Sequence, residues 1–212
     1  MGLRGSYDAA LHLLDRQIVD SDDLMVAKVD DVALSPDLEI VGLLCGPAVL
    51  LPRLGGRLGP KVKDFWERMA PEQADRSTPC FIPVDAIAEV GSEVRLNRVR
   101  QHLLVRHEPP GHRLGDLLGL PVRGGGRSLG RVIDVRVREG RRVDGLVVGR
   151  GGPGSLLGYD RRRDQGPWLV GAVVRWRHRH TGYVGRADVL SIDWGHGVEV
   201  SVAGLGDLPP TT

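Results

Sequence analysis

A group of arginines in the second half of the chain has the residue types best suited to binding a charged partner. Planar guanidinium groups pair with phosphate or carboxylate, and neighbouring aromatic rings offer stacking surface to nucleic acid bases. An anionic lipid surface or an acidic protein would be attracted as well. We predict one exposed positive patch, termed the arginine surface, with a solvated face that binds nothing as the alternative. This candidate partner surface consists of Arg161, Arg162, Arg163, Arg175, Arg177, Arg179 and Trp176.

Five aspartates near the N-terminus are close enough together to suggest a calcium site. They are Asp20, Asp22, Asp23, Asp30 and Asp31. An EF-hand loop requires acidic residues at alternate positions, a mid-loop glycine and a final glutamate, and Leu24 and Met25 interrupt that spacing. A solvated hairpin turn is therefore the preferred interpretation. Asp31 recurs in a similar context as Asp134, which favours a shared structural hydrogen bond over catalysis.

The cysteines and the linker histidines show no ligand spacing. Cys45 and Cys80 lie in apolar stretches without a CxxC partner, which predicts buried thiols in a reducing cytoplasm and neither a zinc nor a redox motif. His102, His107 and His112 are five residues apart and so share no helical face. We interpret them as part of a polar linker.

Two glycine-rich stretches, 124–130 and 149–155, could suggest nucleotide binding. Neither has the GxxxxGK[ST] pattern or the strand-then-helix context of a nucleotide site, so turns explain them better. No GxSxG, HExxH or catalytic-cysteine context occurs. The sequence therefore predicts no catalytic residue, no cofactor and no metal, in a protein that is not an enzyme. An enzyme or small-molecule sensor is the least favoured alternative.

Composition places the chain among globular proteins. The 212 residues are 41% hydrophobic and 26% charged, which suffices for a packed core, and no apolar run is long enough to span a membrane. Residues 1–100 carry 12 Lys+Arg and 16 Asp+Glu, net −4, whereas residues 101–212 carry 17 and 11, net +6. Three lysines among 29 basic residues, with 30 glycines, indicate a GC-rich and therefore bacterial genome.

The elements that would position these residues occur twice along the chain. The segment 27–34 matches 130–137 at an offset of 103 residues, which aligns Val29 with Val132. At the same offset 42–46 falls on 145–149, with glycine at both ends of each segment. Self-similarity over this distance indicates two copies of one module.

Each copy predicts short strands and one amphipathic helix. Val29, Val32 and Leu34 alternate with smaller or polar residues, as in a half-buried strand. A Gly-Pro pair in each copy precedes an apolar stripe with helical spacing. The stripes are Val62, Phe65, Trp66 and Met69 in the first copy and Leu169, Ala172, Val173 and Trp176 in the second. We predict a first module over 1–100, a linker over 101–111, a second module over 112–203 and a flexible tail over 204–212.

Three segments of each copy resemble the PRC-barrel family. In the first copy they are 14–23, 26–32 and 39–46, and in the second they are 118–123, 129–135 and 143–149. The resemblance implies a mainly β fold of two tandem small β-barrels, each with a short inserted helix. It also implies a non-catalytic cytoplasmic adaptor, with access to the membrane periphery, that acts on a protein partner such as a membrane complex. An RNA- or ribosome-associated factor using the basic second half is the alternative, and anionic lipid is a further candidate ligand.

Overall fold

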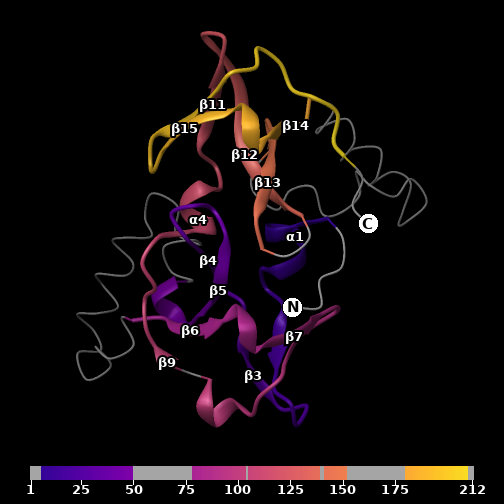
Figure 1. Ribbon diagram of the computed structural model, residues 1–212, viewed down its shortest axis with the longest axis vertical. Helices are drawn as coiled ribbons and strands as arrows, with labels where there is room; N and C mark the ends of the chain where they lie inside the picture. Colours follow the sequence, from indigo (N-terminus) through magenta and orange to yellow (C-terminus); the bar gives the residue numbers. More distant parts are fainter. Residues whose placement is uncertain (1–5, 50–77, 104, 139–140, 152–179, 210–212) are drawn as a thin grey trace. The chain divides into compact units, whose positions relative to one another are not determined.

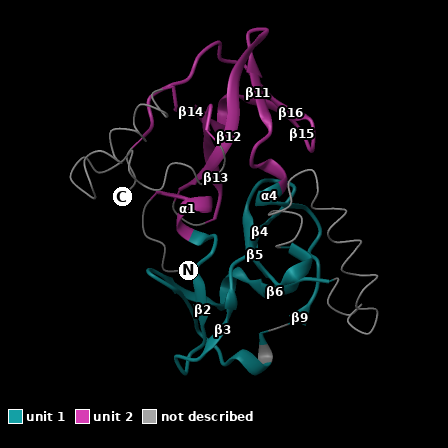
Figure 2. Cartoon of the chain, turned by 180° about the vertical axis from the view of Figure 1, so that it is seen from behind, with its two compact units in different colours: residues 1–3, 13–115 teal, residues 4–12, 116–212 magenta. Residues whose placement is uncertain are grey.

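The computed structural model describes residues 6–49, 78–103, 105–138, 141–151 and 180–209. The chain divides into two compact units (Figure 2). The first comprises Met1–Leu3 and Leu13–Gly115, and the second Arg4–His12 and Asp116–Thr212. Both predicted apolar stripes, and the helices inferred from them, lie outside the described residues.

The first repeat forms most of two small sheets, ordered β10-β4-β5-β6-β9 and β3-β2-β8-β7 (Figure 1). Two of these strands, β9 (Val105–Arg106) and β10 (His112–Arg113), follow the first repeat in the chain. The first repeat supplies the rest. Its own elements are β2 (Gln17–Val19), β3 (Met25–Lys28), β4 (Asp31–Leu34), β5 (Ile40–Cys45), β6 (Cys80–Pro83), the 3₁₀ turn η3 (Val84–Ala86), β7 (Ile87–Val90) and β8 (Val94–Leu96). Neighbouring strands are antiparallel, apart from the parallel pair β2–β8.

The second repeat builds the same order within one sheet, β14-β13-β12-β11-β16-β15. Its elements are β11 (Pro121–Gly124), β12 (Arg127–Val137), β13 (Val143–Gly149), β14 (Gly182–Gly185), the 3₁₀ turn η5 (Arg186–Asp188), β15 (Val189–Asp193) and β16 (Gly197–Val200). The long strand β12 corresponds to β3 and β4 together. The first repeat has two sheets because its chain leaves the strand conformation at Val29 and Asp30.

Strand pairing confirms the predicted repeat and its register. Asp31 lies opposite Leu44 in the first repeat, and Asp134 lies opposite Val147 in the second. Both repeats then skip one residue on the second strand, Val41 or Asp144, which is a β-bulge at the same place.

A predominantly β fold is confirmed, whereas closed barrels are not. Among the described residues the strands form several sheets, none of which closes into a barrel. In the second unit the two end strands of the main path, β14 and β15, are consecutive in the chain and are joined by η5. The chain runs from one edge strand to the other through η5, and no backbone hydrogen bonds pair these two described edge strands.

The strand predicted to be half-buried is buried throughout. All four residues of β4 are buried, including Asp31 and Ala33. Ala33 packs in a cluster with Leu44 and Val49, and the Asp31 carboxylate accepts backbone hydrogen bonds. The alternation of residue types predicted one buried face, whereas both faces of β4 are buried.

The segments expected as linker and tail contain paired backbone. Within the predicted linker, β9 (Val105–Arg106) pairs with β6 and follows the 3₁₀ turn η4 (Arg100–His102). Within the predicted tail, Gly206 forms an antiparallel bridge with Tyr183.

The first strand of each repeat pairs with the other repeat. Strand β1 (Tyr7–Asp8), which leads into α1 (Ala9–Leu13), lies antiparallel to β12. Strand β10 (His112–Arg113), which leads into α4 (Leu114–Leu117), lies antiparallel to β4. Each unit is thus completed by a short segment from the start of the other repeat (Figure 2).

Candidate functional site

The arginine surface lies outside the described residues. None of its members, Arg161, Arg162, Arg163, Arg175, Arg177, Arg179 or Trp176, falls within the described ranges. Described polar groups gather instead where β1 joins the second unit, and two of the four exposed large apolar residues of the described ranges are adjacent at one hairpin of the first unit.

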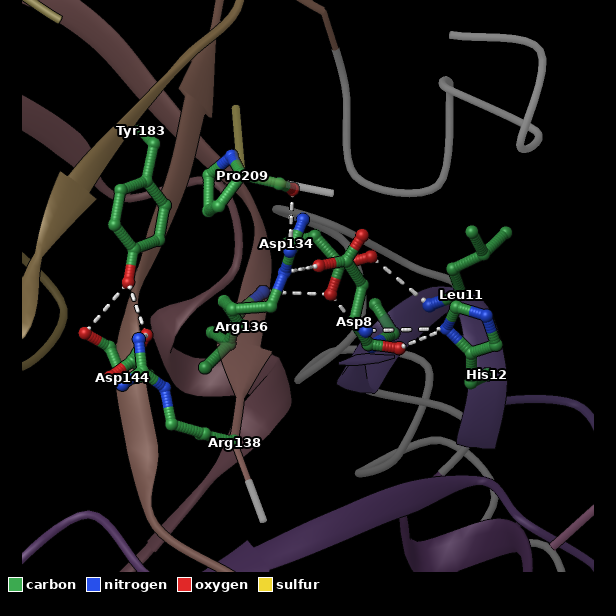
Figure 3. A network of polar contacts seen from close by, with 11 residues as sticks. Asp8, Leu11, His12, Asp134, Arg136, Arg138, Asp144, Tyr183 and Pro209 are labelled. Atoms are coloured by element: carbon green, nitrogen blue, oxygen red, sulfur yellow. Dashed lines mark hydrogen bonds and ion pairs between the residues drawn. The ribbon is translucent and has the colours of Figure 1, made fainter. Parts of the chain in front are cut away.

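A buried ion pair joins β1 to β12. The side chains of Asp8 and Arg136 are both 0% exposed, and Arg136 Nε donates to Asp8 Oδ1 at 2.6 Å. Arg136 Nη1 also donates to the carbonyl oxygen of Pro209 at 2.7 Å (Figure 3). The two residues are direct partners in the strand register, so the charge pair links the exchanged strand to the sheet that receives it.

Asp134 caps the helix that follows β1. Its Oδ1 accepts hydrogen bonds from the amides of Ala10 at 2.8 Å and Val135 at 2.7 Å, and its Oδ2 accepts one from Leu11 at 3.1 Å. The carboxylate thereby satisfies amides at the start of α1, which lack partners within the helix. Burial raises the pKa of Asp134 from 3.8 to about 6, although the three amides and Arg136 act in the opposite direction.

Asp31 has the same role in the first unit. Its Oδ1 accepts hydrogen bonds from the amide of Val32 at 2.8 Å and from that of Gly115, in α4, at 2.9 Å. The predicted shared structural hydrogen bond of Asp31 and Asp134 is therefore confirmed. In each unit the aspartate holds a helix that begins the other repeat.

The charge pair itself is present in only one unit. Ala33 occupies the position equivalent to Arg136, and Arg113 lies opposite Ala33 as Asp8 lies opposite Arg136. Arg113 forms an ion pair with Glu108, whose side chain is 56% exposed. A β1 strand paired with β4 would place the Asp8 carboxylate opposite Ala33, without this arginine. The charges therefore favour pairing of β1 with β12.

The titration of Asp134 predicts a pH effect on stability. Because its pKa is higher in the folded state than the ordinary value, the folded chain binds a proton between about pH 6 and pH 4 more readily than the unfolded chain does. We expect the free energy of unfolding to rise through this window as pH falls, relative to Asp134→Asn. Urea titrations of both proteins at several pH values measure the difference, and a difference independent of pH would contradict the assignment.

A second polar network covers the bulge of β13. The Tyr183 hydroxyl lies 2.8 Å from the carbonyl oxygen of Asp144 and 2.9 Å from Asp144 Oδ2, and Arg138 Nη2 donates to the same carboxylate oxygen at 3.1 Å (Figure 3). Burial raises the pKa of Tyr183, and hydrogen bonding to Asp144 raises it further. The hydroxyl therefore remains a proton donor to Asp144 at neutral pH.

The ring of Tyr183 also covers a glycine, as Phe81 does in the first repeat. A Cβ atom on Gly145 would lie 2.4 Å from the Tyr183 ring, and one on Gly42 would lie 2.4 Å from the Phe81 ring. The repeat alignment already paired the two glycines, since segment 42–46 falls on 145–149. The structural meaning of this match depends on the cross-strand register, which the alignment did not reveal.

The aspartates of the first repeat serve turns and strands. Asp20 is buried and accepts amide hydrogen bonds from Asp22, Leu24 and Arg100. Burial acts to raise the pKa of Asp20, but these amides together lower it below the ordinary value. The hairpin predicted for this stretch is confirmed by the pairing of β2 with β3. Among the described residues, no cluster of three His, Cys, Asp or Glu side chains could hold a metal ion.

The described glycines at 124–126 form a turn, and one of the linker histidines packs against an aromatic ring. Gly125 and Gly126 adopt φ values of 57° and 74° in the turn between β11 and β12, as the turn interpretation predicts. His107 packs edge-on against Phe81, with ring centroids 5.9 Å apart. Gly149 ends β13, and positions 152–155 of its glycine-rich stretch lie outside the described residues.

Large apolar side chains are exposed at the tip of the β2–β3 hairpin. Leu24 is 49% exposed and Met25 is 54% exposed. We define the β2–β3 tip as these two residues together with the exposed Asp22. The register of the repeats places Arg127 and Ser128 at the positions of Leu24 and Met25. The apolar tip therefore belongs to one repeat alone.

No protein-family model matches the chain, and no curated protein matches it. Within the described ranges, no helix combines the length and the hydropathy needed to cross a bilayer.

Proposed function

We propose that this chain is a non-catalytic cytoplasmic binding protein of two PRC-barrel-like repeats that docks a protein partner through the β2–β3 tip. The strand order common to both repeats supports the barrel-like relationship, as does the 3₁₀ turn that joins the two end strands. The buried carboxylates Asp31 and Asp134 serve as helix caps. Both carboxylates therefore have a structural role.

The exposure of Leu24 and Met25 is the observation that carries the proposal. About half of each side chain faces solvent, although burying such a side chain fully would contribute roughly 1.5–3 kcal/mol. A turn does not require large apolar residues, because the equivalent turn of the second repeat has Arg127 and Ser128. Exposed apolar residues with a polar rim are typical of protein interaction sites.

The surroundings of the tip define the partner's chemistry. Asp22 is exposed beside the apolar pair, and the exposed Asp23 forms an ion pair with Arg95. Methionine adapts its shape to different partner surfaces. We therefore expect a protein with an apolar pocket for Leu24 and Met25 and a basic residue at the pocket edge near Asp22.

Site-specific photo-crosslinking in the native host cells tests the docking surface. A photoreactive residue in place of Met25 should yield one discrete protein adduct, and the same residue in place of Ser128 should not. Adding Leu24→Asp should abolish the adduct while changing the stability by less than about 0.5 kcal/mol, as is usual for exposed positions. Absence of an adduct at position 25, or an equal adduct at position 128, would contradict the proposal.

RNA binding by the second repeat is the second candidate. Arg123 and Arg127 are both exposed at the β11–β12 hairpin, and Arg131 is exposed further along β12. The arginines of the arginine surface add to the net positive charge of the second half of the sequence. An adduct at position 128 that is removed by ribonuclease and weakened by salt would favour this candidate over the first.

A further inference from the structure

The two cysteines of the chain face each other across neighbouring strands. Cys45 ends β5, Cys80 begins β6, and the antiparallel register makes them direct partners. Directly opposed residues in such a pair have Cα atoms about 4.5–5.5 Å apart. A disulfide spans about 4.4–6.8 Å between Cα atoms, so the backbone already places these residues at a distance that a disulfide can bridge.

The two thiols differ in access. Cys45 is 3% exposed, whereas Cys80 is partly exposed. Burial, together with the nearby Asp30, raises the pKa of Cys45 to about 12. Cys80 is therefore the thiol that an oxidant in solution reaches first, and Cys45 is placed to react second.

Packing alone does not require a cysteine at either position. The equivalent partners in the second repeat are Val148 and Gly182. A small apolar residue therefore suffices on the β5 side, and no side chain is needed on the β6 side. The first repeat alone has a thiol at both positions of this pair.

We propose that Cys45 and Cys80 form a reversible disulfide, which makes the β5–β6 strand pair an oxidisable site in the first unit. The Cys80 thiolate attacks glutathione disulfide and releases one glutathione thiolate, forming a mixed disulfide. The Cys45 thiolate then attacks Cys80 Sγ and displaces the second glutathione. The protein loses two protons and two electrons, and glutathione disulfide becomes two glutathione thiols.

The bond would turn residues 45–80 into a closed loop. It would covalently join the end of β5 to the start of β6. A well-reduced glutathione pool keeps such a pair as thiols, and a shift toward glutathione disulfide oxidises it. The proposal concerns the redox state of the first unit and does not depend on the proposed docking surface.

Intact-mass measurement of the whole protein in glutathione redox buffers tests this proposal. After the free thiols are alkylated, we expect a species that has lost two hydrogens and carries neither alkyl group nor glutathione. Because the chain has only two cysteines, an internal disulfide can join only Cys45 to Cys80. We expect the folded protein to form it at a glutathione disulfide level about tenfold lower than the same chain in concentrated urea, where a flexible loop provides only a millimolar effective concentration.

Cys45→Val, which installs the residue of the second repeat, is the matched control. This variant should stop at a glutathione adduct on Cys80, and its urea midpoint should not rise on oxidation, whereas that of the wild type should. The proposal is overturned if the folded wild type retains two alkylatable thiols or stops at the adduct. It is also overturned if the unfolded chain closes the disulfide as readily as the folded one.

Discussion

Replacing Arg136 with methionine should lower the free energy of unfolding by about 3–5 kcal/mol, the usual cost of removing one member of a buried ion pair. The substitution leaves the fully buried Asp8 carboxylate without its 2.6 Å guanidinium partner, and it removes the donor to the Pro209 carbonyl. Chemical denaturation followed by far-UV circular dichroism measures the loss. Amide hydrogen exchange should show the largest increase in β1 and α1, which this pair anchors.

An exposed ion pair of the first unit provides the control. Arg113, in the other exchanged strand β10, forms an ion pair with Glu108, whose side chain is 56% exposed. Glu108→Ala should cost less than about 1 kcal/mol because surface ion pairs contribute little. The double variant Asp8→Leu with Arg136→Met should recover most of the stability, because no uncompensated charge remains. Equal losses for Arg136→Met and Glu108→Ala would show that the buried pair has no special role.

Gly42→Val should lower the free energy of unfolding by about 3 kcal/mol, at the upper end of overpacking costs. A Cβ atom on Gly42 would lie 2.4 Å from the Ile82 carbonyl oxygen and 2.4 Å from the Phe81 ring. The ring could move aside, but the carbonyl oxygen belongs to the strand paired with β5. Thermal and urea unfolding of the purified variant measure the loss.

Gly91→Val is the matched control for crowding. A Cβ atom there has no neighbour within 4 Å, so the change should cost far less than Gly42→Val. Gly145→Val should behave like Gly42→Val, since its Cβ atom would lie 2.4 Å from the Val184 carbonyl oxygen. A tolerated Gly42→Val would contradict the strand register that places the Phe81 ring over this glycine.

Much of the fold was predictable because the repeated residues report a repeated backbone. The offset that aligns Val29 with Val132 also relates the strand pairing and the β-bulge of the two repeats. The match of Asp31 with Asp134 correctly indicated a structural hydrogen bond. These features were accessible because each depends on short segments that occur twice in the same order.

The strand exchange was not predictable from residue patterns. Strands β1 and β10 are two residues long, too short to show alternation, and the two repeats offer them similar edges. The ion pair of Asp8 with Arg136 favours pairing of β1 with β12, but these two residues are 128 residues apart in the sequence. An aspartate and an arginine so far apart give no sign that they are paired and buried.

The facing cysteines and the apolar tip were missed for related reasons. Cys45 and Cys80 lie in separate apolar stretches, and only the register of β5 with β6 brings them together. Leu24 and Met25 were noted for interrupting an acidic run, whereas their exposure depends on the geometry of the hairpin. The arginine surface remains a prediction because its residues lie outside the described part of the chain.

Backbone nuclear Overhauser effects at the exchanged strands test the central claim, that the first strand of each repeat pairs with a strand of the other repeat. The exchange predicts cross-strand contacts of Tyr7–Asp8 with Arg136–Val137, and of His112–Arg113 with Ala33–Leu34. The repeats without exchange would show the opposite pairing. Contacts of Tyr7–Asp8 with Ala33–Leu34, and of His112–Arg113 with Arg136–Val137, would contradict the account.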